Sequence, residues 1–362
     1  MAGANDCASW MLDMASGMVT SRTLVPGRGP AGDPMAADPL SDVLKTVRLT
    51  GATFFDVAAR APWVAEQPSP KTILPTLLPG AGHLISYHVV TEGRCFGSII
   101  GGEPVPIDAG EVIVFTRGDA HIMASDPSLR AKQPNPASLY EEGAAQQPFV
   151  ADIGEEGPIA TKLVCGFLAC DAWPFNPLFD NLPPIIKVAA GPGSESRWLS
   201  QFIHVATHET ADRRAGGESV LARLSELMFI EVIRRHLADM PEAQVGWLAG
   251  LRDPFVSKAL SLMHARPAHN WTIDELARDV GVSRSVLAER FNFMVGVPPI
   301  QYLAKWRMQI AAGLLSSGNN NIARIAEETG YSSEAAFSRA FKRMVGVAPS
   351  AHRRRGYSSP AH

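Results

Sequence analysis

One short helical pattern occurs twice near the C-terminal end of the sequence, and this repeat constrains the fold more than any other feature. The segment Ile273–Ser283 has a counterpart in Ile322–Ser332, 49 positions later. After a one-residue slip, Phe291 matches Phe341 at a spacing of 50. A duplication of this size indicates two copies of one structural motif.

Each copy has the pattern of a helix, a tight turn and a second helix. In the first copy, Leu276, Ala277 and Val280 share one face of a short helix. Gly281 follows where a helix end favours a left-handed residue, and Ser283 is a good N-cap for the next helix. The remaining core and turn positions are Leu287 and Phe291 in the first copy, and Ile325, Ala326, Gly330, Ser332, Phe337 and Phe341 in the second.

This pattern predicts a helix-turn-helix, whose second helix enters the DNA major groove. A single copy would also fit an ordinary helical hairpin, but the duplication favours DNA binding. Between the copies, Tyr302–Leu315 has apolar residues at helical spacing and predicts a connecting helix. A rigid connection would place two recognition helices in successive major grooves, roughly 34 Å apart.

The region Pro254–Arg355 resembles the DNA-binding domain of the AraC/XylS family of bacterial transcription regulators, most closely over Gly330–Arg343 and Gly346–Pro349. The resemblance implies a sequence-specific regulator, an activator among the possible roles, that binds double-stranded promoter DNA, acts with RNA polymerase and forms a homodimer. Carried over by position, the family's DNA contacts fall on Ser285, Ala288, Glu289, Glu334, Ala335 and Arg339. Glu289 departs from the family, whose members often have a basic or amide side chain there. A carboxylate can accept only from cytosine N4 or must avoid the phosphates.

Basic side chains extend this set of candidate DNA contacts. From Pro254 to Arg355 there are fourteen Lys or Arg and seven Asp or Glu, whereas the whole chain has a net charge of -3. Such a basic region attracts phosphate. Arg307, in the connecting helix, either reaches the DNA backbone or pairs with a carboxylate. The other candidates are Arg284, Arg290, Ser333, Lys342, Arg343 and the run Arg353–Arg355.

The N-terminal part of the chain has the pattern of an all-β domain. Short runs rich in β-formers alternate with Gly and Pro, which predicts an antiparallel sandwich or barrel. The expected strands are Thr53–Val57, Leu84–Thr91, Cys95–Ile100, Glu111–Phe115, His121–Ala124 and Thr161–Leu168.

Two segments of this region, His88–Glu92 and Gly110–His121, are similar to the two motifs of cupins. Cupin enzymes hold a metal with a His-x-His pair, a Glu and a later His, and Ser86 replaces the first of these histidines. His88 and Glu92 share one face of a regular strand, because their spacing is even. With His121 and Cys165 they form a candidate site for zinc or another divalent metal.

Four alternatives stay open at this point. His88, His121 and Cys165 are also consistent with ordinary core or pocket residues, and the domain would then sense an organic effector. The cysteines Cys95, Cys165 and Cys170 could form an oxidation sensor. The chain could also be a cupin-type metalloenzyme with a helical appendage, or a DNA-binding protein of constitutive action.

The predicted fold is therefore a cupin-like β-barrel, a helical segment and an all-α double helix-turn-helix. Helical spacing over Ser194–Thr210 and Ser219–Ala238 predicts two helices that either cover the barrel or pair two subunits. The expected order is a flexible tail 1–38, an effector-binding domain 39–190, a helical segment 191–240, a linker 241–253, a DNA-binding domain 254–355 and a tail 356–362.

Composition excludes other classes of protein. No apolar run approaches the roughly 18 residues that cross a membrane, and the first thirty residues lack the features of a signal peptide. The four cysteines are too scattered for a disulfide scaffold. We therefore expect a cytoplasmic protein with reduced thiols and no membrane partner.

Overall fold

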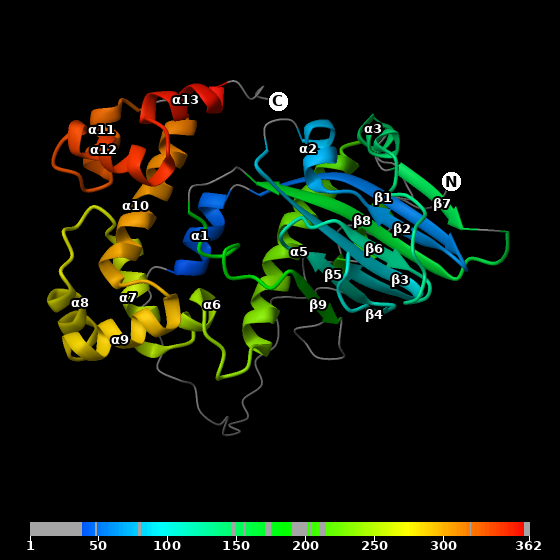
Figure 1. The fold of residues 1–362 in the computed structure, drawn as a ribbon, viewed down its shortest axis with the longest axis horizontal. Coiled ribbons are helices and arrows are strands. Elements are labelled where there is room, and N and C mark those ends of the chain that lie inside the picture. Colours follow the sequence, from blue (N-terminus) through cyan, green and yellow to red (C-terminus); the bar gives the residue numbers. More distant parts are fainter. Residues whose placement is uncertain are drawn as a thin grey trace, which may run out of the picture. The chain divides into compact units, whose positions relative to one another are not determined.

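The computed structural model places a strand-rich region before a helical region along the chain (Figure 1). It describes residues 38–357 except 48, 79–80, 146–148, 155, 171–174, 190–200, 203, 207, 210–214 and 319. The predicted tail 1–38, apart from Asp38, lies outside the described residues, as does most of the tail 356–362. Much of the predicted helix Ser194–Thr210 also lies outside them.

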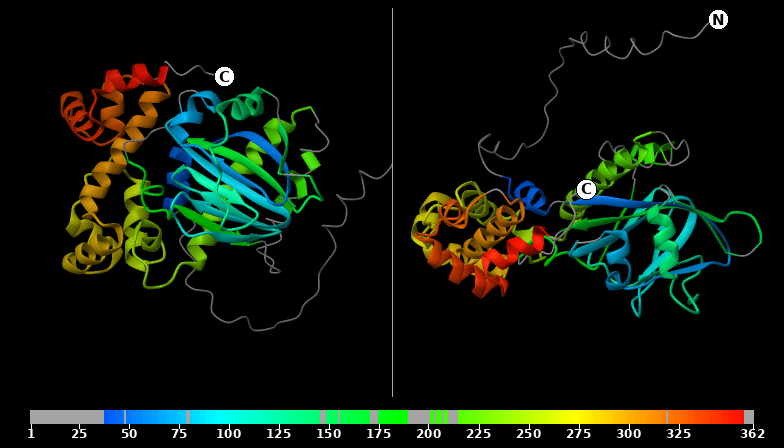
Figure 2. Two further views of the ribbon diagram at one scale, coloured as in Figure 1. Left: turned by 45° about the vertical axis from the view of Figure 1, so that its right-hand side comes forward. Right: turned by 90° about the horizontal axis from the view of Figure 1, so that it is seen from above.

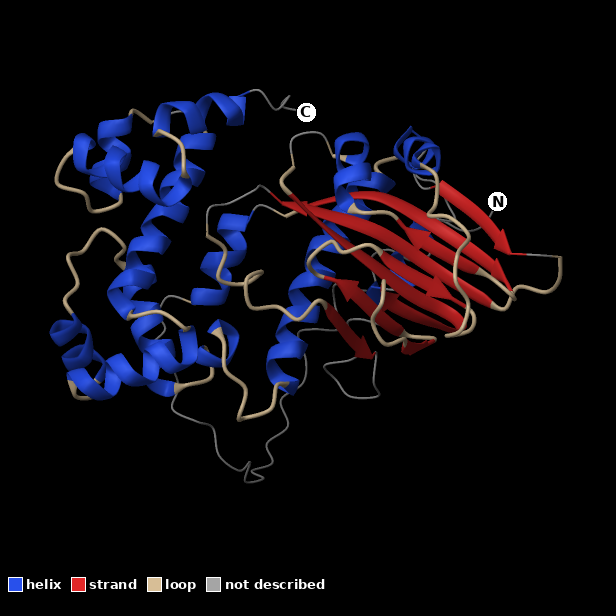
Figure 3. Cartoon of the chain, in the orientation of Figure 1, coloured by secondary structure: helices blue, strands red, loops and turns tan. Residues whose placement is uncertain are grey.

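Nine strands form a single bent sheet, shown in red in Figure 3. The main path through the sheet is β2-β6-β3-β8-β1-β7, with β4 and β5 also paired to β3 and β9 paired to β5. Of the recorded strand pairs, only β1 with β7 is parallel. The strands are β1 (Thr50–Arg60), β2 (Val64–Gln67), β3 (His83–Ile99), β4 (Val105–Asp108), β5 (Glu111–Phe115), β6 (His121–Ala124), β7 (Phe149–Gly154), β8 (Thr161–Cys170) and β9 (Ile185–Ala189).

The six strands predicted from the sequence are all present, and the cupin-like architecture is confirmed. Two of the predicted strands, Leu84–Thr91 and Cys95–Ile100, are halves of β3. The chain continues between them because Gly93 adopts a φ of 77°, and a Cβ there would lie 2.0 Å from the carbonyl oxygen of Ala160. The first half of β3 pairs with β5 and β8, and the second half pairs with β4 and β6.

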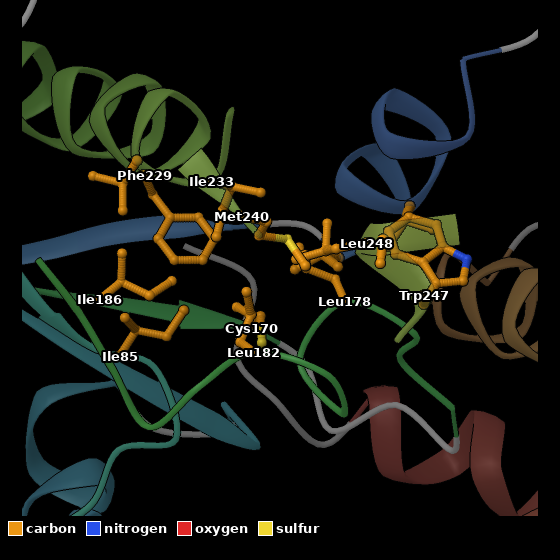
Figure 4. Close-up of a cluster of buried hydrophobic side chains, with 14 of the residues drawn as sticks. Ile85, Cys170, Leu178, Leu182, Ile186, Phe229, Ile233, Met240, Trp247 and Leu248 are labelled. Carbon is orange, nitrogen blue, oxygen red and sulfur yellow. The ribbon is translucent and has the colours of Figure 1, made fainter. Parts of the chain in front are cut away.

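Helix α5 (Gly217–Asp239), predicted as Ser219–Ala238, packs on β1, β8 and β9 (Figure 2). The Tyr87 hydroxyl lies 2.6 Å from the Ser225 hydroxyl and ties β3 to α5. Gly166 leaves the space that Tyr87 fills, since a Cβ there would lie 2.4 Å from the tyrosine oxygen. In Figure 4, Phe229 of α5 faces Ile85 of the sheet, within a buried apolar cluster.

The same cluster continues into the stretch 241–253, where the sequence predicted a linker. The structure forms helix α6 (Trp247–Gly250) here, because Trp247 and Leu248 are apolar enough to be buried. The Trp247 Nε1–H donates to the Tyr302 hydroxyl at 3.0 Å. This segment is therefore part of the core and not a simple connection.

All secondary-structure elements described in the C-terminal region are helices. The connecting helix predicted over Tyr302–Leu315 is present as α10. The helices of this region are α7 (Pro254–Ala265), α8 (Ile273–Val280), α9 (Arg284–Val295), α10 (Pro299–Ser316), α11 (Ile322–Glu328), α12 (Glu334–Val345) and α13 (Pro349–Tyr357). Three further helices precede the strands or lie between them in sequence: α1 (Pro39–Val47), α2 (Pro70–Leu77) and α3 (Ala137–Ala145). None of these three was expected from the sequence.

Candidate DNA-binding surface and ligand cavity

Two helix-turn-helix units, α8-α9 and α11-α12, form as the repeat predicts. In the first unit Gly281 adopts a φ of 95°, and the Ser283 side chain accepts a hydrogen bond from the Val286 amide. In the second unit Gly330 adopts a φ of 76°. The core positions predicted in both units are buried: Leu276, Ala277, Val280, Leu287, Phe291, Ile325, Ala326, Phe337 and Phe341.

The second unit differs from the prediction at its N-cap. Ser333, and not Ser332, caps α12 by accepting from the Ala336 amide at 3.2 Å. The cause is the one-residue slip of the repeat, which the structure places between Gly330 and α12. Ser333 is thus the true counterpart of Ser283, at a spacing of 50.

Most of the candidate DNA contacts lie on the outward faces of α9 and α12. Ala288 is half-buried, and the other candidates on these two helices and their caps are exposed: Arg284, Ser285, Glu289, Arg290, Ser333, Glu334, Ala335, Arg339, Lys342 and Arg343. Two N-capped helices joined by α10 therefore present polar and charged side chains to solvent.

The two units differ in how their cations are paired. In the first unit, Arg284 lies 3.5 Å from Asp274, and Arg290 pairs with the buried Asp253, which caps α7. Within the described chain, no carboxylate lies within salt-bridge distance of Arg339, Lys342 or Arg343, all in α12. The second unit therefore offers more uncompensated positive charge to DNA phosphates.

Arg307 has a structural role that the sequence did not reveal. It donates to the carbonyl oxygens of Pro267 and His269 at 2.6 and 2.8 Å, and so fastens the segment between α7 and α8 to α10. Among the described residues Arg307 forms no ion pair with a carboxylate, and its contact to the DNA backbone stays a prediction.

A cavity of about 90 Å³ lies among β1, β2, β3, β6, β7, β8 and the neighbourhood of α3. Its lining is mostly apolar and includes two of the predicted site residues on the two cupin-like segments, His88 and His121, together with Cys165. The full lining is Phe55, Val57, Trp63, Ala65, Gln67, His88, His121, Met123, Asn135, Leu139, Tyr140, Ala151, Ile153, Leu163, Cys165 and Phe167.

The two histidines contact each other directly. His88 Nε2 lies 2.8 Å from His121 Nε2, and His121 Nδ1 lies 3.0 Å from the Asp119 carbonyl oxygen. The His121 ring also stacks on Phe115, with centroids 3.7 Å apart. Burial lowers the pKa of His121 to about 4, and burial together with the nearby His121 lowers the pKa of His88.

Glu92 lies away from this pair. A β-bulge between Val90 and Glu92 breaks the regular alternation of β3, so the even spacing from His88 no longer places both side chains on one face. Glu92 is exposed and pairs with Lys162 at 2.8 Å. The structure therefore brings together three of the four predicted metal ligands around one cavity.

These residues do not fit a metal ion. Two nitrogens bound to one tetrahedral zinc are about 3.4 Å apart, so the 2.8 Å separation is that of a hydrogen bond. Among the described residues, no three His, Cys, Asp or Glu side chains are placed to hold a metal. Burial also raises the pKa of the Cys165 thiol, and raises that of Cys95 to about 12, which disfavours the reactive thiolate.

A cavity-bearing barrel joined to two helix-turn-helix units defines a DNA-binding transcription regulator. Residues 38–238 match the family described as Cupin, and residues 276–355 match the family described as Helix-turn-helix domain. A protein described as an AraC-like transcription regulator from Streptomyces antibioticus is 33% identical over 88% of this chain and 98% of its own length. The chain belongs to the family of AraC-like transcription regulators.

The chain is also similar to two further proteins. The HTH-type transcriptional regulator AlkR of Acinetobacter baylyi is 25% identical over 87% of this chain and 99% of its own. An AraC-type regulator structure from Chromobacterium violaceum is 28% identical, covers 30% of this chain and 97% of its own, and has a TM-score of 0.29. This chain is accordingly a transcription regulator and not an enzyme. In the part of the chain described, no helix has the length and apolar character to span a membrane.

Proposed function

We propose that this regulator binds promoter DNA with α9 and α12 in successive major grooves, and that a small molecule in the barrel cavity controls DNA binding or transcription. The observation that carries the proposal is the pair of N-capped recognition helices, with exposed polar faces, on one connecting helix. Its partners are then promoter DNA, the effector and RNA polymerase, and the protein works in the cytoplasm beside the nucleoid.

The contribution of the two helices to affinity is unequal. The cations of α9 have carboxylate partners, which must be given up or shared when DNA approaches. Helix α12 has three exposed cations that can bind phosphate without first giving up a carboxylate partner: Arg339, Lys342 and Arg343. We therefore assign most of the salt-dependent affinity to the second unit and regard the first as the weaker one.

The effector signal has a short structural route to the DNA-binding helices. The interior face of β3 lines the cavity, and Tyr87 on its other face bonds to Ser225 of α5. From α5 the buried cluster runs through Met240 to Trp247, which bonds to Tyr302 in α10. A ligand acts through this path only if it favours one arrangement of these elements over another.

Helix α5 also supports the proposed homodimer. Val220 and Leu227, two helical turns apart, have 42% and 50% of their surface exposed. Apolar side chains at this spacing form a stripe that a second copy of the same helix can cover.

Titration of the full-length protein against a DNA fragment from its own promoter tests this function. The expected result is specific binding that changes when an effector is added. Equal affinity for promoter and unrelated DNA, or equal binding and equal transcription with every effector tried, would reject the corresponding half of the proposal.

A further inference from the structure

Two buried polar atoms near the cavity have no hydrogen-bond partner. Among the described residues, Trp63 Nε1 and His88 Nδ1 are buried, unpartnered, and carried by side chains that line the cavity. The other polar groups of the lining are partly satisfied: the Gln67 amide donates to Ser86 at 2.7 Å, and the Asn135 amide donates to the Tyr140 hydroxyl at 3.4 Å. An unsatisfied buried polar atom is costly, so the two free atoms indicate what a ligand supplies.

The hydrogen-bond chain fixes the role of each histidine nitrogen. The Asp119 carbonyl can only accept, so His121 Nδ1 carries the proton. With a pKa of about 4 the His121 ring is neutral at neutral pH, and its Nε2 must accept. His88 Nε2 therefore donates to it, which leaves His88 Nδ1 as a bare acceptor in a neutral ring. Trp63 Nε1–H is a donor only.

Charge and shape restrict the ligand further. None of the described residues that line the cavity is Lys, Arg, Asp or Glu, so a carboxylate or ammonium group would be buried without a counter-charge. The aromatic rings of Phe55, Trp63, Tyr140 and Phe167 surround the remaining space. Flat aromatic molecules pack well against such rings, and the volume of about 90 Å³ limits them to small ones.

We propose that the cavity binds a small neutral aromatic molecule with one hydroxyl group, of the phenol class, whose hydroxyl donates to His88 Nδ1 and accepts from Trp63 Nε1. A hydroxyl is the smallest group that both donates and accepts a hydrogen bond. A single ligand hydroxyl can therefore serve His88 Nδ1 as donor and Trp63 Nε1–H as acceptor. This assignment rests on the proposed function, in which the cavity is the effector site.

Calorimetry and thermal shift on the full-length protein test the assignment with four probes: phenol, toluene, anisole and benzoate. Phenol is expected to bind one per chain and to raise Tm. Toluene lacks the hydroxyl, and anisole can accept but not donate, so both are expected to bind at least about tenfold more weakly. Benzoate is expected not to bind.

Two variants connect this selectivity to the structure. His88→Phe removes the acceptor and keeps an aromatic ring, so the preference for phenol over toluene should fall to what the Trp63 Nε1–H donor alone contributes. Ala151→Phe fills the cavity while leaving both histidines in place, so phenol should bind it at least about tenfold more weakly than it binds the wild-type protein. If His88→Phe fails to fold, the Ala151→Phe variant and the four-probe comparison still decide the matter.

The outcomes separate the ligand class from the regulatory function. Equal binding of phenol and toluene by the wild-type protein, preferred binding of benzoate, or no binding of phenol overturns the phenol class. Phenol binding that His88→Phe weakens more than it weakens toluene binding, but that changes neither promoter affinity nor transcription, supports the ligand class and overturns the regulatory function of the cavity.

Discussion

Phe293 and Arg343 occupy equivalent positions, the tenth residue of α9 and of α12, and both side chains are exposed. Phe293 is 66% exposed. An arginine at this position can neutralise a DNA phosphate, and a phenylalanine cannot. The two copies of the motif have thus diverged at a position where we expect the difference to alter the affinity for DNA.

The Arg343→Phe substitution should weaken promoter binding and reduce the slope of log affinity against log salt by about 0.9. Phe293→Arg should change both quantities in the opposite direction. Fluorescence anisotropy over a range of salt concentrations measures them. Arg324→Ala is the matched control, because Arg324 pairs with Glu328 within α11 at 2.8 Å. An unchanged slope in Arg343→Phe would show that Arg343 does not contact phosphate.

Ser333→Ala should lower the free energy of unfolding by about 1 kcal/mol, because it removes the N-cap of α12. Ser332→Ala, one residue earlier and also exposed, should have little effect. Denaturant unfolding followed by circular dichroism compares the two. A larger loss in Ser332→Ala than in Ser333→Ala would contradict the assignment of the cap.

Local patterns predicted most of the fold. The core of each helix-turn-helix unit follows from apolar spacing and from a glycine and a serine at the turn, and all these signals are local. Six short β-rich runs indicated five of the nine strands, whereas β2, β4, β7 and β9 are too short or too polar on one face to stand out. The exposed, alternating residues of β7 illustrate this, since its burial alternates between partial and none.

The site required information that local patterns lack. The position of Glu92 depends on a β-bulge in β3. Gly93 is the one sequence feature near this bulge that could have indicated it, because glycine tolerates the positive φ found there. The role of Arg307 depends on two carbonyl groups about forty residues away in sequence. Trp63, which carries one of the free polar atoms of the cavity, lies outside both cupin-like motifs and could be found only through the fold.

Stability should fall in mildly acidic solution because of the buried histidine pair. His121 has an ordinary pKa of 6.5 and a folded pKa of about 4, so the unfolded chain holds more protons between these values. The contribution of neutral His121 to the free energy of unfolding is therefore complete above about pH 6.5 and is lost as the pH falls towards 4. Between pH 7 and pH 5 the free energy of unfolding is expected to fall by on the order of 1–2 kcal/mol.

Thermal unfolding at several pH values checks this dependence. His121→Gln should flatten it, because the titrating ring is gone. Phe115→Leu removes the stacking partner and keeps both histidines, so it should lower Tm while preserving the dependence on pH. Identical pH profiles for the wild type and His121→Gln would refute the role of the pair.

Metal removal should leave the protein unchanged. The described residues offer a hydrogen-bonded histidine pair without a third ligand, so chelation should shift neither Tm nor promoter affinity. Mass spectrometry on protein purified without a metal-affinity tag measures the content directly. About one zinc or iron per chain, lost in His121→Ala, would show that the cavity is a metal site after all.

We propose that both helix-turn-helix units of one chain contact DNA together. Hydroxyl-radical footprinting of the full-length protein on its own promoter tests it most directly. We expect two protected segments per protomer, about 10 base pairs apart on one face of the duplex, with the segment opposite α12 retained at higher salt. A single protected segment per protomer, or two segments on opposite faces, would contradict it.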